Sequence, residues 1–236
     1  MSTVLITGAS RGIGKAAAKL FAKAGWDLLL VARSNNDLQL LTEELTKTTV
    51  STIRYKSIDL SDPAAIALGV DELVGNGVSP AVLINNAGVA WTGELLSMSL
   101  ERWQWVFQMN VTSVFQVCSA VVPLMRSSGG LIINVSSHAA RNAFPQWGAY
   151  CITKAALASF TKCLAEEERM NGIRACTLTI GSVNSTLWDT DTVQSDFDRN
   201  SMLTVENAAS ALLYMAEQPS SQVIEDLTLM PATGAF

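Results

Sequence analysis

A short apolar segment, a glycine-rich turn and a helix-forming segment follow one another at the start of the chain. Residues Thr3 to Thr7 have the composition of a buried strand, and Ile13 to Ala24 has helical spacing. Between them, Gly8 permits a sharp exit from the strand, Gly12 lets backbone approach a ligand, and Gly14 lets the helix pack close to the sheet. A helix N-terminus offers N–H groups and a positive dipole to an anion. The sequence therefore predicts a site for the phosphates of a dinucleotide. The same turn contains Ser10, Arg11 and Ile13.

Strand-like and helix-like segments alternate along the chain, which is typical of a parallel sheet with helices on both faces. With 236 residues, 49% of them hydrophobic, the chain is long enough to bury one large core. We therefore predict a single α/β domain over residues 1–236, a Rossmann-like, doubly wound αβα sandwich with about seven parallel strands. The predicted strands are Thr3–Thr7, Trp26–Ala32, Ile53–Ile58, Ala81–Ile84, Leu131–Val135, Arg174–Thr179 and Ile224–Leu229. The predicted helices are Ile13–Ala24, Pro63–Val74, Leu100–Arg126, Gly148–Met170 and Val205–Glu217.

A polar stretch from Ser182 to Leu203 follows the sixth predicted strand. It is rich in Asp and Thr, with Trp188, Phe197 and Met202 embedded in it. Loops at the carboxyl ends of parallel strands carry the ligand sites of such folds. We therefore expect residues 182–203 to form a mobile lid over the site.

Arg33 discriminates between two dinucleotides. It stands at the end of the second predicted strand, about 20 residues past the glycines, where an acidic residue would bind a free ribose 2′-hydroxyl and an Arg can pair with a 2′-phosphate. Arg11 adds a second cation within reach of the same phosphate. Both arginines could instead be solvated surface residues, but the absence of an acid at position 33 favours NADP(H) over NAD(H).

Tyr150 and Lys154 form a candidate acid–base pair. They stand four residues apart in a segment predicted to be helical, and Ser137 lies thirteen residues upstream. Residues four apart share a helix face, so the Lys ammonium can lie beside the Tyr phenol and help hold its proton ready for transfer.

Taken together, the motifs resemble those of the short-chain dehydrogenase/reductase family over nearly the whole chain. They are Thr7 to Gly14, Asn85-Asn86-Ala87-Gly88, Ser137 within Asn134-Val135-Ser136-Ser137, and Tyr150-x3-Lys154, with Asn110 at the family's fourth catalytic position. The ordered set at family spacing is far more specific than any one motif.

The resemblance implies roles for these residues. Tyr150 would be the general acid in carbonyl reduction, or the base in alcohol oxidation, with Lys154 lowering its pKa and bonding the nicotinamide ribose. Ser137 would hydrogen-bond the substrate oxygen, and Asn110 would hold a water between helix backbone and Lys154. The cofactor contacts that the resemblance adds are Asp59 and Leu60 near the adenine, Asn86, Ala87 and Gly88 beside the ribose, and Gly181, Val183 and Ser185 near the nicotinamide. Asp59 could alternatively cap the helix that starts near Pro63.

The implied activity is NADPH-dependent reduction of a ketone, aldehyde or keto acid, with a 3-oxoacyl group as a further substrate class. The family includes reductases of 3-oxoacyl groups on an acidic carrier protein, and a chain of net charge −5 complements such a partner poorly. Basic patches around Arg102, Arg126, Arg141 or Arg169 could still dock it. The alternatives are an NAD-dependent alcohol dehydrogenase, which Arg33 disfavours, and a catalytically silent NADPH-binding regulator, which the intact catalytic positions disfavour.

The predicted substrate pocket is mostly apolar, which suggests a carbonyl on a hydrophobic or aromatic body. Its predicted lining consists of Val89, Ala90, Trp91, Phe144, Trp147, Trp188 and Phe197. His138 follows Ser137 directly, and on a strand the two side chains would point to opposite faces, so we expect His138 behind the site or at the surface.

One position departs from the family pattern. Ile180 stands where relatives usually carry Pro, before Gly181, and Pro fixes φ while Ile does not. The turn that seats the nicotinamide is therefore expected to be less rigid.

Composition and charge exclude several other functions. The net charge of −5 and the lack of clustered Lys and Arg disfavour nucleic acid. The most apolar stretch, Val111 to Met125, is interrupted by polar residues and Pro123, which predicts a buried helix and no membrane role. The N-terminus lacks a basic leader, so we expect a cytoplasmic protein.

The four cysteines predict neither a disulfide framework nor a metal site, because they show no CxxC spacing and no His partner. Free, mostly buried thiols are expected instead. Low charge with many apolar residues predicts hydrophobic surface to cover, and hence a homo-oligomer, a dimer or tetramer.

Overall fold

The computed structural model describes residues 2–75 and 77–234, and within them seven parallel strands form one sheet. The strand order is β3-β2-β1-β4-β5-β6-β7, so the order reverses between β1 and β4. This confirms the predicted doubly wound α/β fold. The strands are β1 (Thr3–Thr7), β2 (Asp27–Ala32), β3 (Ile53–Ser57), β4 (Val82–Asn85), β5 (Gly130–Ser137), β6 (Ile173–Ile180) and β7 (Asp226–Leu229).

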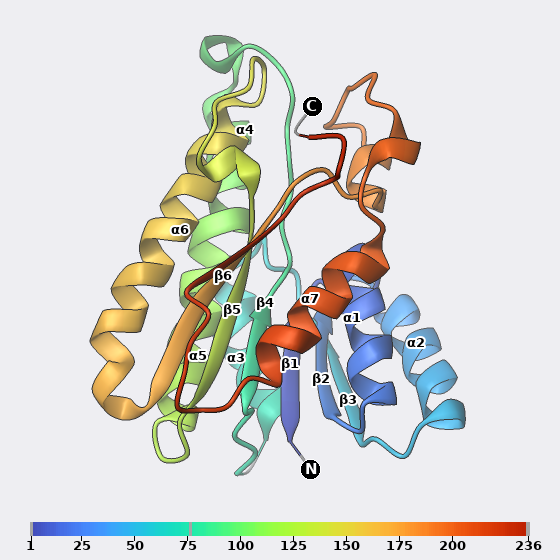
Figure 1. The fold of residues 1–236 in the computed structure, drawn as a ribbon, viewed down its shortest axis with the longest axis vertical. Helices are drawn as coiled ribbons and strands as arrows, with labels where there is room; N and C mark the ends of the chain where they lie inside the picture. Colours follow the sequence, from blue (N-terminus) through green and yellow to red (C-terminus); the bar gives the residue numbers. More distant parts are fainter. Residues whose placement is uncertain (1, 76, 235–236) are drawn as a thin grey trace.

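Helices cover both faces of the sheet (Figure 1). One face packs against α1 (Gly12–Lys23), α2 (Asn35–Thr48) and α7 (Val205–Ala216). The other packs against α3 (Pro63–Val74), α5 (Ser113–Met125) and α6 (Gly148–Glu168), with α4 (Leu100–Phe107) leading into α5. Central strands such as β1 and β4 are buried on both faces, which explains their continuous apolar runs.

Helix α2 is absent from the prediction. Its sequence is polar on average, yet Leu38, Leu41 and Leu45 are buried along one face at helical spacing. The Ser34 side chain accepts a hydrogen bond from the Asp37 N–H and caps the helix. The narrow apolar face and the cap are therefore the signals that could have identified it.

The predicted helix Leu100–Arg126 is not one regular helix. A π-helical turn, Gln108–Thr112, separates α4 from α5 and contains the buried Asn110. Such turns are frequent at functional sites, because the added residue re-aims side chains. Among the described residues, Leu100–Met125 is the one run long and apolar enough to cross a membrane. In this fold, α5 packs against α3 and the sheet as a core helix.

The topology places the ends of several strands together. Where strand order reverses in an open parallel sheet, the chains leaving the carboxyl ends of the strands diverge and open a crevice. Here that reversal lies between β1 and β4, and β5 and β6 follow beside them. We call the carboxyl ends of β1, β2, β4, β5 and β6, with the segments that leave them, the carboxyl edge.

Candidate active site

A cleft of about 710 Å3 lies along the carboxyl edge and gathers most of the predicted cofactor-binding residues. Of the predicted residues it is lined by Gly8, Ser10, Arg11, Gly12, Ile13, Arg33, Asp59, Leu60, Asn86, Ala87, Gly88, Tyr150, Lys154 and Ser185. Gly181 and Val183 instead line a second, smaller cavity. Gly14 lies against the strand exit, where a Cβ would stand 2.2 Å from the Gly8 carbonyl oxygen.

The glycine-rich turn has the geometry that a pyrophosphate requires. Gly8 and Gly12 have φ of +68° and +54°, values that side chains other than glycine's rarely adopt. Arg11 is the N-cap residue of α1, and its side chain makes no hydrogen bond to the N–H groups of the first helical turn. A Cβ at Gly12 would project toward Ser185, 3.6 Å from its Cβ, and would narrow the cleft. The residues present therefore fit a bound dinucleotide.

Polar side chains hold the ends of β1 and β4 together. The Thr7 hydroxyl accepts hydrogen bonds from the backbone N–H groups of Asn86 and Ala87, both at 3.1 Å. The Asn86 amide in turn donates to the Thr7 and Gly8 carbonyl oxygens, at 2.9 and 3.3 Å. These hydrogen bonds join the two loops that form the floor of the cleft. The Asn86 side chain thus positions the glycine-rich turn.

Two arginines line the cleft. Arg11 and Arg33 both line it and are both exposed, as a group that binds a phosphate must be. Asp59 accepts hydrogen bonds from the Ser61 N–H and hydroxyl, at 2.9 and 2.7 Å. Burial opposes ionisation of Asp59, but the Ser61 bonds and the charge of Arg33 together lower its pKa below the ordinary value. Asp62, not Asp59, caps α3, so the alternative capping role of Asp59 is wrong.

Lys154 is a buried cation on α6. It is 5% exposed, its Nζ donates to the Val135 carbonyl oxygen at 2.9 Å, and no acidic side chain pairs with it among the described residues. Its Nζ lies 5.7 Å from the centre of the Tyr150 ring. Burial lowers the pKa of Lys154 to about 8, because desolvation penalises the charged form.

Tyr150 lies one turn before Lys154 and faces Ser137, the last residue of β5. Burial raises the pKa of Tyr150 to about 12, while hydrogen bonding to Ser137 acts in the opposite direction. The resemblance implies a lowering of the Tyr150 pKa by Lys154, and that role stays a prediction, because burial outweighs the contributions that lower this pKa. The phenol is therefore held in its protonated form.

Asn110 ties three elements together from the π-helical turn. Its side-chain oxygen accepts from the Val89 N–H at 2.9 Å, and its amide donates to the Val89 carbonyl oxygen and the Thr153 hydroxyl, at 2.9 and 3.0 Å. Thr153 then donates to the Tyr150 carbonyl oxygen at 2.9 Å. The side chain of Asn110 thus positions the turn of α6 that carries Tyr150, a contact that could not be predicted without the π turn.

A second cavity, of about 120 Å3, opens beside Tyr150. It shares Ile13, Tyr150, Ile180, Ser185 and Leu187 with the cleft. Its further walls are Ser137, His138, Ala139, Phe144, Trp147, Gly181, Ser182, Val183, Trp188 and Phe197. Four of its rings make successive edge-to-face contacts, Tyr150 to Trp147 to Trp188 to Phe197, at centroid distances of 5.6–5.7 Å.

Three predicted placements around this cavity need correction. Trp91 lines neither the cleft nor the cavity, because its ring folds against Gly93. Val89 and Ala90 line the cleft, not the apolar cavity. His138 lies at the cavity wall, because β5 ends at Ser137 and His138 begins a 3-10 turn, His138–Ala140, so strand alternation does not apply to it.

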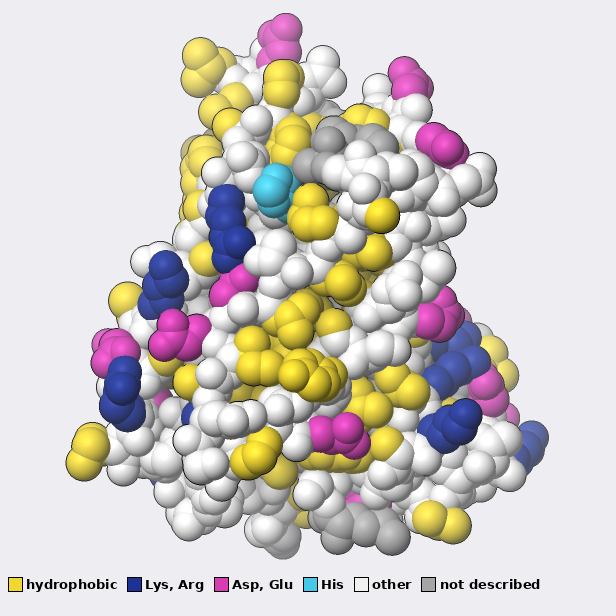
Figure 2. Space-filling view, viewed as in Figure 1, with side chains coloured by type: hydrophobic (Ala, Val, Ile, Leu, Met, Phe, Trp, Pro, Cys, Tyr) yellow, Lys and Arg dark blue, Asp and Glu magenta, His cyan; other side chains and the backbone are white. Residues whose placement is uncertain are grey.

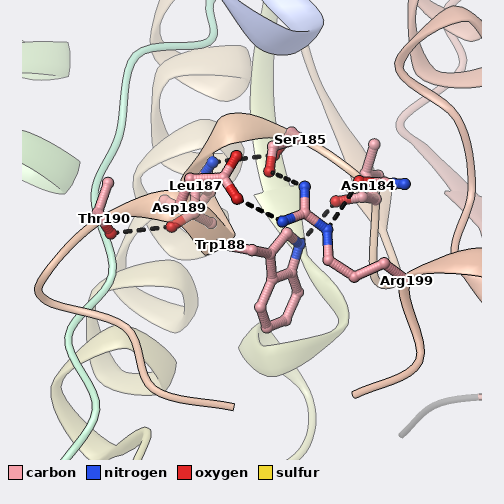
Figure 3. A network of polar contacts seen from close by, with 8 residues as sticks. Asn184, Ser185, Leu187, Trp188, Asp189, Thr190 and Arg199 are labelled. Atoms are coloured by element: carbon pink, nitrogen blue, oxygen red, sulfur yellow. Dashed lines mark hydrogen bonds and ion pairs between the residues drawn. The ribbon is translucent and has the colours of Figure 1, made fainter. Parts of the chain in front are cut away.

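The segment 182–203 is tied together by Arg199 (Figure 3). The Arg199 guanidinium donates to the Asn184 side chain at 2.8 Å and to the Ser185 carbonyl oxygen at 3.1 Å, and it pairs with Asp189. The Trp188 indole N–H donates to the Val183 carbonyl oxygen at 2.7 Å. These bonds hold Trp188 against the cavity, and the mobility of the segment stays a prediction.

Ile180 extends β6 to the cleft. It pairs with Ser137 of β5 and Leu229 of β7, and the next residue, Gly181, donates its N–H to the Leu229 carbonyl oxygen at 2.9 Å. Hydrogen bonds of the sheet therefore support the turn after Ile180. These bonds form whether or not residue 180 has the fixed φ of a proline.

Comparison with known proteins gives one consistent family. A family model described as short chain dehydrogenase matches residues 2–198. The 3-oxoacyl-(acyl-carrier-protein) reductase of Chlamydia trachomatis is 30% identical over 233 residues, which cover 94% of this chain and 92% of that protein.

Solved structures agree with this match. An alcohol dehydrogenase from the archaeon Thermococcus sibiricus, complexed with 5-hydroxy-NADP, superposes with a TM-score of 0.91 at 24% identity, covers 98% of this chain and 97% of its own, and shows the same fold. A short-chain dehydrogenase from Sphingobium yanoikuyae, in complex with NADPH, has a TM-score of 0.84 and 28% identity, over 98% of this chain and 88% of its own.

The buried charge of Lys154 predicts that its removal stabilises the fold. The unfolded chain keeps the Lys154 proton up to its ordinary pKa of 10.5 and the folded chain releases it above about 8, so the buried charge is a full penalty below pH 8. We expect Lys154→Met to raise the unfolding free energy by roughly 1 to 3 kcal/mol near pH 7, the lost Val135 hydrogen bond offsetting part of the gain. The wild-type protein recovers stability as pH rises from about 8 toward 10.5, so the difference should shrink there.

Urea unfolding at about pH 7 and about pH 9.5 measures this difference. Lys162→Met, on an exposed position of the same helix, is the control and should show neither the gain nor its pH dependence. A Lys154→Met protein that is less stable than wild type near pH 7 would show that the ammonium is fully compensated.

Proposed function

The chain belongs to the short-chain dehydrogenase family, and we propose that it uses NADPH to reduce the carbonyl group of a small molecule. One observation carries the proposal: Tyr150 lines both the dinucleotide cleft and the apolar cavity, with Ser137 at the cavity side and Lys154 at the cleft side. A carbonyl in the cavity and a nicotinamide in the cleft would therefore meet at the phenol.

NADP(H) is supported by positive charge in the wall of the cleft. Arg33 and Arg11 supply two cations for a 2′-phosphate, and position 33 holds no acid that would bind a free 2′-hydroxyl. The Sphingobium relative, 28% identical, is complexed with NADPH. Both observations support the phosphorylated cofactor over NADH.

The chain's own residues handle the proton. NADPH, when bound in the cleft, would supply a hydride to the carbonyl carbon. As negative charge grows on the carbonyl oxygen, Tyr150 donates its proton there and Ser137 hydrogen-bonds the same oxygen. A Tyr150 pKa raised by burial keeps the proton on the phenol until that charge develops. The positive charge of Lys154, kept close by Val135, favours the phenolate that remains.

The surface cations support a small substrate over one attached to a carrier protein. Arg126 pairs with Glu168, Arg141 with Asp226, and Arg169 with Glu166. Arg102 lies over the Trp105 ring at 5.1 Å and belongs to the wall of the cleft. The basic patches that could dock an acidic partner are therefore largely neutralised by the chain's own carboxylates.

We propose further that the enzyme is a cytoplasmic homo-oligomer. β7 is one of the two edge strands of the sheet, and Figure 2 shows hydrophobic side chains gathered across the middle of the face that carries α7 and β7. Tyr214 and Val223 on this side are 55% and 41% exposed. A second copy of the chain that covers this edge would remove both an open strand and exposed apolar surface from water.

Arg33→Asp tests the cofactor proposal. The substitution removes a partner for the 2′-phosphate and supplies an acceptor for the 2′-hydroxyl, so the preference for NADPH over NADH should fall by about 100-fold or more. The dissociation constants of the two cofactors, measured by Trp fluorescence, give this ratio. Arg169→Asp, which changes net charge equally but lies in the 3-10 turn Arg169–Asn171 after α6, should leave it unchanged. Unchanged selectivity in Arg33→Asp would refute the assignment.

Tyr150→Phe tests the chemistry, since it keeps the ring and removes the proton. We expect kcat with any accepted ketone to fall by at least about 100-fold, the usual worth of a general acid, while NADPH binding changes little. NADPH oxidation measures the turnover, and Tyr214→Phe, at an exposed tyrosine, is the control. Turnover within about tenfold of wild type, roughly 1.4 kcal/mol, would exclude Tyr150 as the general acid.

A further inference from the structure

Two polar groups in the apolar cavity have no role in the proposed proton transfer. Ser182 and His138 both line the cavity beside Ser137. The Ser182 hydroxyl oxygen is buried and has no hydrogen-bond partner among the described residues. A buried hydroxyl without a partner costs free energy that a ligand with a matching group would restore.

The tautomer of His138 follows from its neighbour Asn142. The Asn142 amide nitrogen lies 2.8 Å from His138 Nε2 and 3.5 Å from the His138 carbonyl oxygen. A carbonyl oxygen can only accept, so the amide nitrogen is the donor toward both atoms. In the neutral imidazole this contact makes His138 Nε2 the acceptor, which assigns the single ring proton to Nδ1. No hydrogen bond among residues 2–75 and 77–234 uses this Nδ1–H, so it is available to a ligand.

The register of the sheet places these two groups together. Ser137 and Ile180 are paired at the ends of β5 and β6. His138 follows the first of them by one residue and Ser182 follows the second by two, so both leave adjacent strands at the same edge. They therefore line the same cavity as Ser137 and Tyr150, the two residues proposed to bind the carbonyl oxygen.

We propose that His138 and Ser182 bind a second oxygen of the substrate, and that the substrate is a compact, uncharged ketone with a hydroxyl group close to the reacting carbonyl. This inference deepens the proposed function and rests on it. A hydroxyl group can accept from His138 Nδ1–H and exchange a hydrogen bond with Ser182, whereas a methyl group can do neither. The cavity wall has no Lys, Arg, Asp or Glu, so an ionised keto acid would lie there without a counter-charge.

Matched ketone pairs test the inference. Hydroxyacetone and 2-butanone differ only by hydroxyl against methyl, as do 2-hydroxyacetophenone and propiophenone. We expect wild-type kcat/KM to favour the hydroxylated member of at least one pair by about tenfold or more, because a site built to hydrogen-bond a hydroxyl rejects the analogue that lacks it. The same ratio should fall to about one in His138→Phe and fall by several-fold in Ser182→Ala. Phe144→Leu, an apolar change in the same cavity wall, should alter both members of a pair alike and keep the ratio.

Binding separates this inference from the proposed function. Dissociation constants of the same ketones for the NADP+-loaded protein follow from Trp fluorescence, since Trp147 and Trp188 line the cavity. Tighter binding of the hydroxylated ketone, if it is lost in His138→Phe, supports the inference even where NADPH is not oxidised. Absence of NADPH oxidation in that case would refute only the reductase activity. Turnover or binding that never favours the hydroxylated member in wild type, or a ratio that His138→Phe and Ser182→Ala leave unchanged, overturns the inference. Absence of both turnover and binding overturns both.

Discussion

The site depends on a lysine ammonium buried beneath the carboxyl edge of the sheet. Lys154 has one carbonyl partner, Val135, and no paired acid among the described residues, so its charge is sustained only because α6 is held rigidly against β5. A ladder of buried amides provides that rigidity: Asn85 donates to Asn134 at 2.9 Å, and Asn134 donates to Thr161 of α6 at 2.8 Å. The buried charge therefore lowers the stability of the fold and adds nothing to its packing. Destabilising groups of this kind are expected at functional sites.

From this constraint the other parts of the site follow. Because α6 packs along β5 and β6 and starts near the carboxyl end of β5, its first turns lie between a polar cleft and an aromatic cavity, and Tyr150 lines both. Asn110 fixes that part of α6 from one side through Thr153. On the opposite side, Arg199 holds the segment that carries Trp188 against the cavity. These contacts hold Tyr150 between the two spaces that the proposed reactants would occupy.

Much of this arrangement could be predicted from local sequence, because its signals are local. The turn from Gly8 to Gly14 and the alternation of strand-like and helix-like segments predict the fold. The four-residue spacing of Tyr150 and Lys154 predicts the acid–base pair. What the sequence did not predict depends on contacts between distant segments or on departures from regular geometry. The π turn around Asn110 has no periodic signature. The contact of the Trp91 ring with Gly93, which keeps Trp91 out of the substrate cavity, has no signal in the sequence. The position of His138 depends on the end of β5 at Ser137, which sequence patterns do not define to one residue.

The proposed function depends on the transfer of a hydride from NADPH to a ketone at the carboxyl edge. Deuterium placed at the transferable position of NADPH tests it most directly, with the alcohol product of the matched ketones read by mass spectrometry. We expect one deuterium on the carbinol carbon of the product, and loss of that label transfer in Tyr150→Phe. Tight binding of NADPH without transfer of label to any ketone would refute the reductase activity and would leave a protein that binds the cofactor for another purpose.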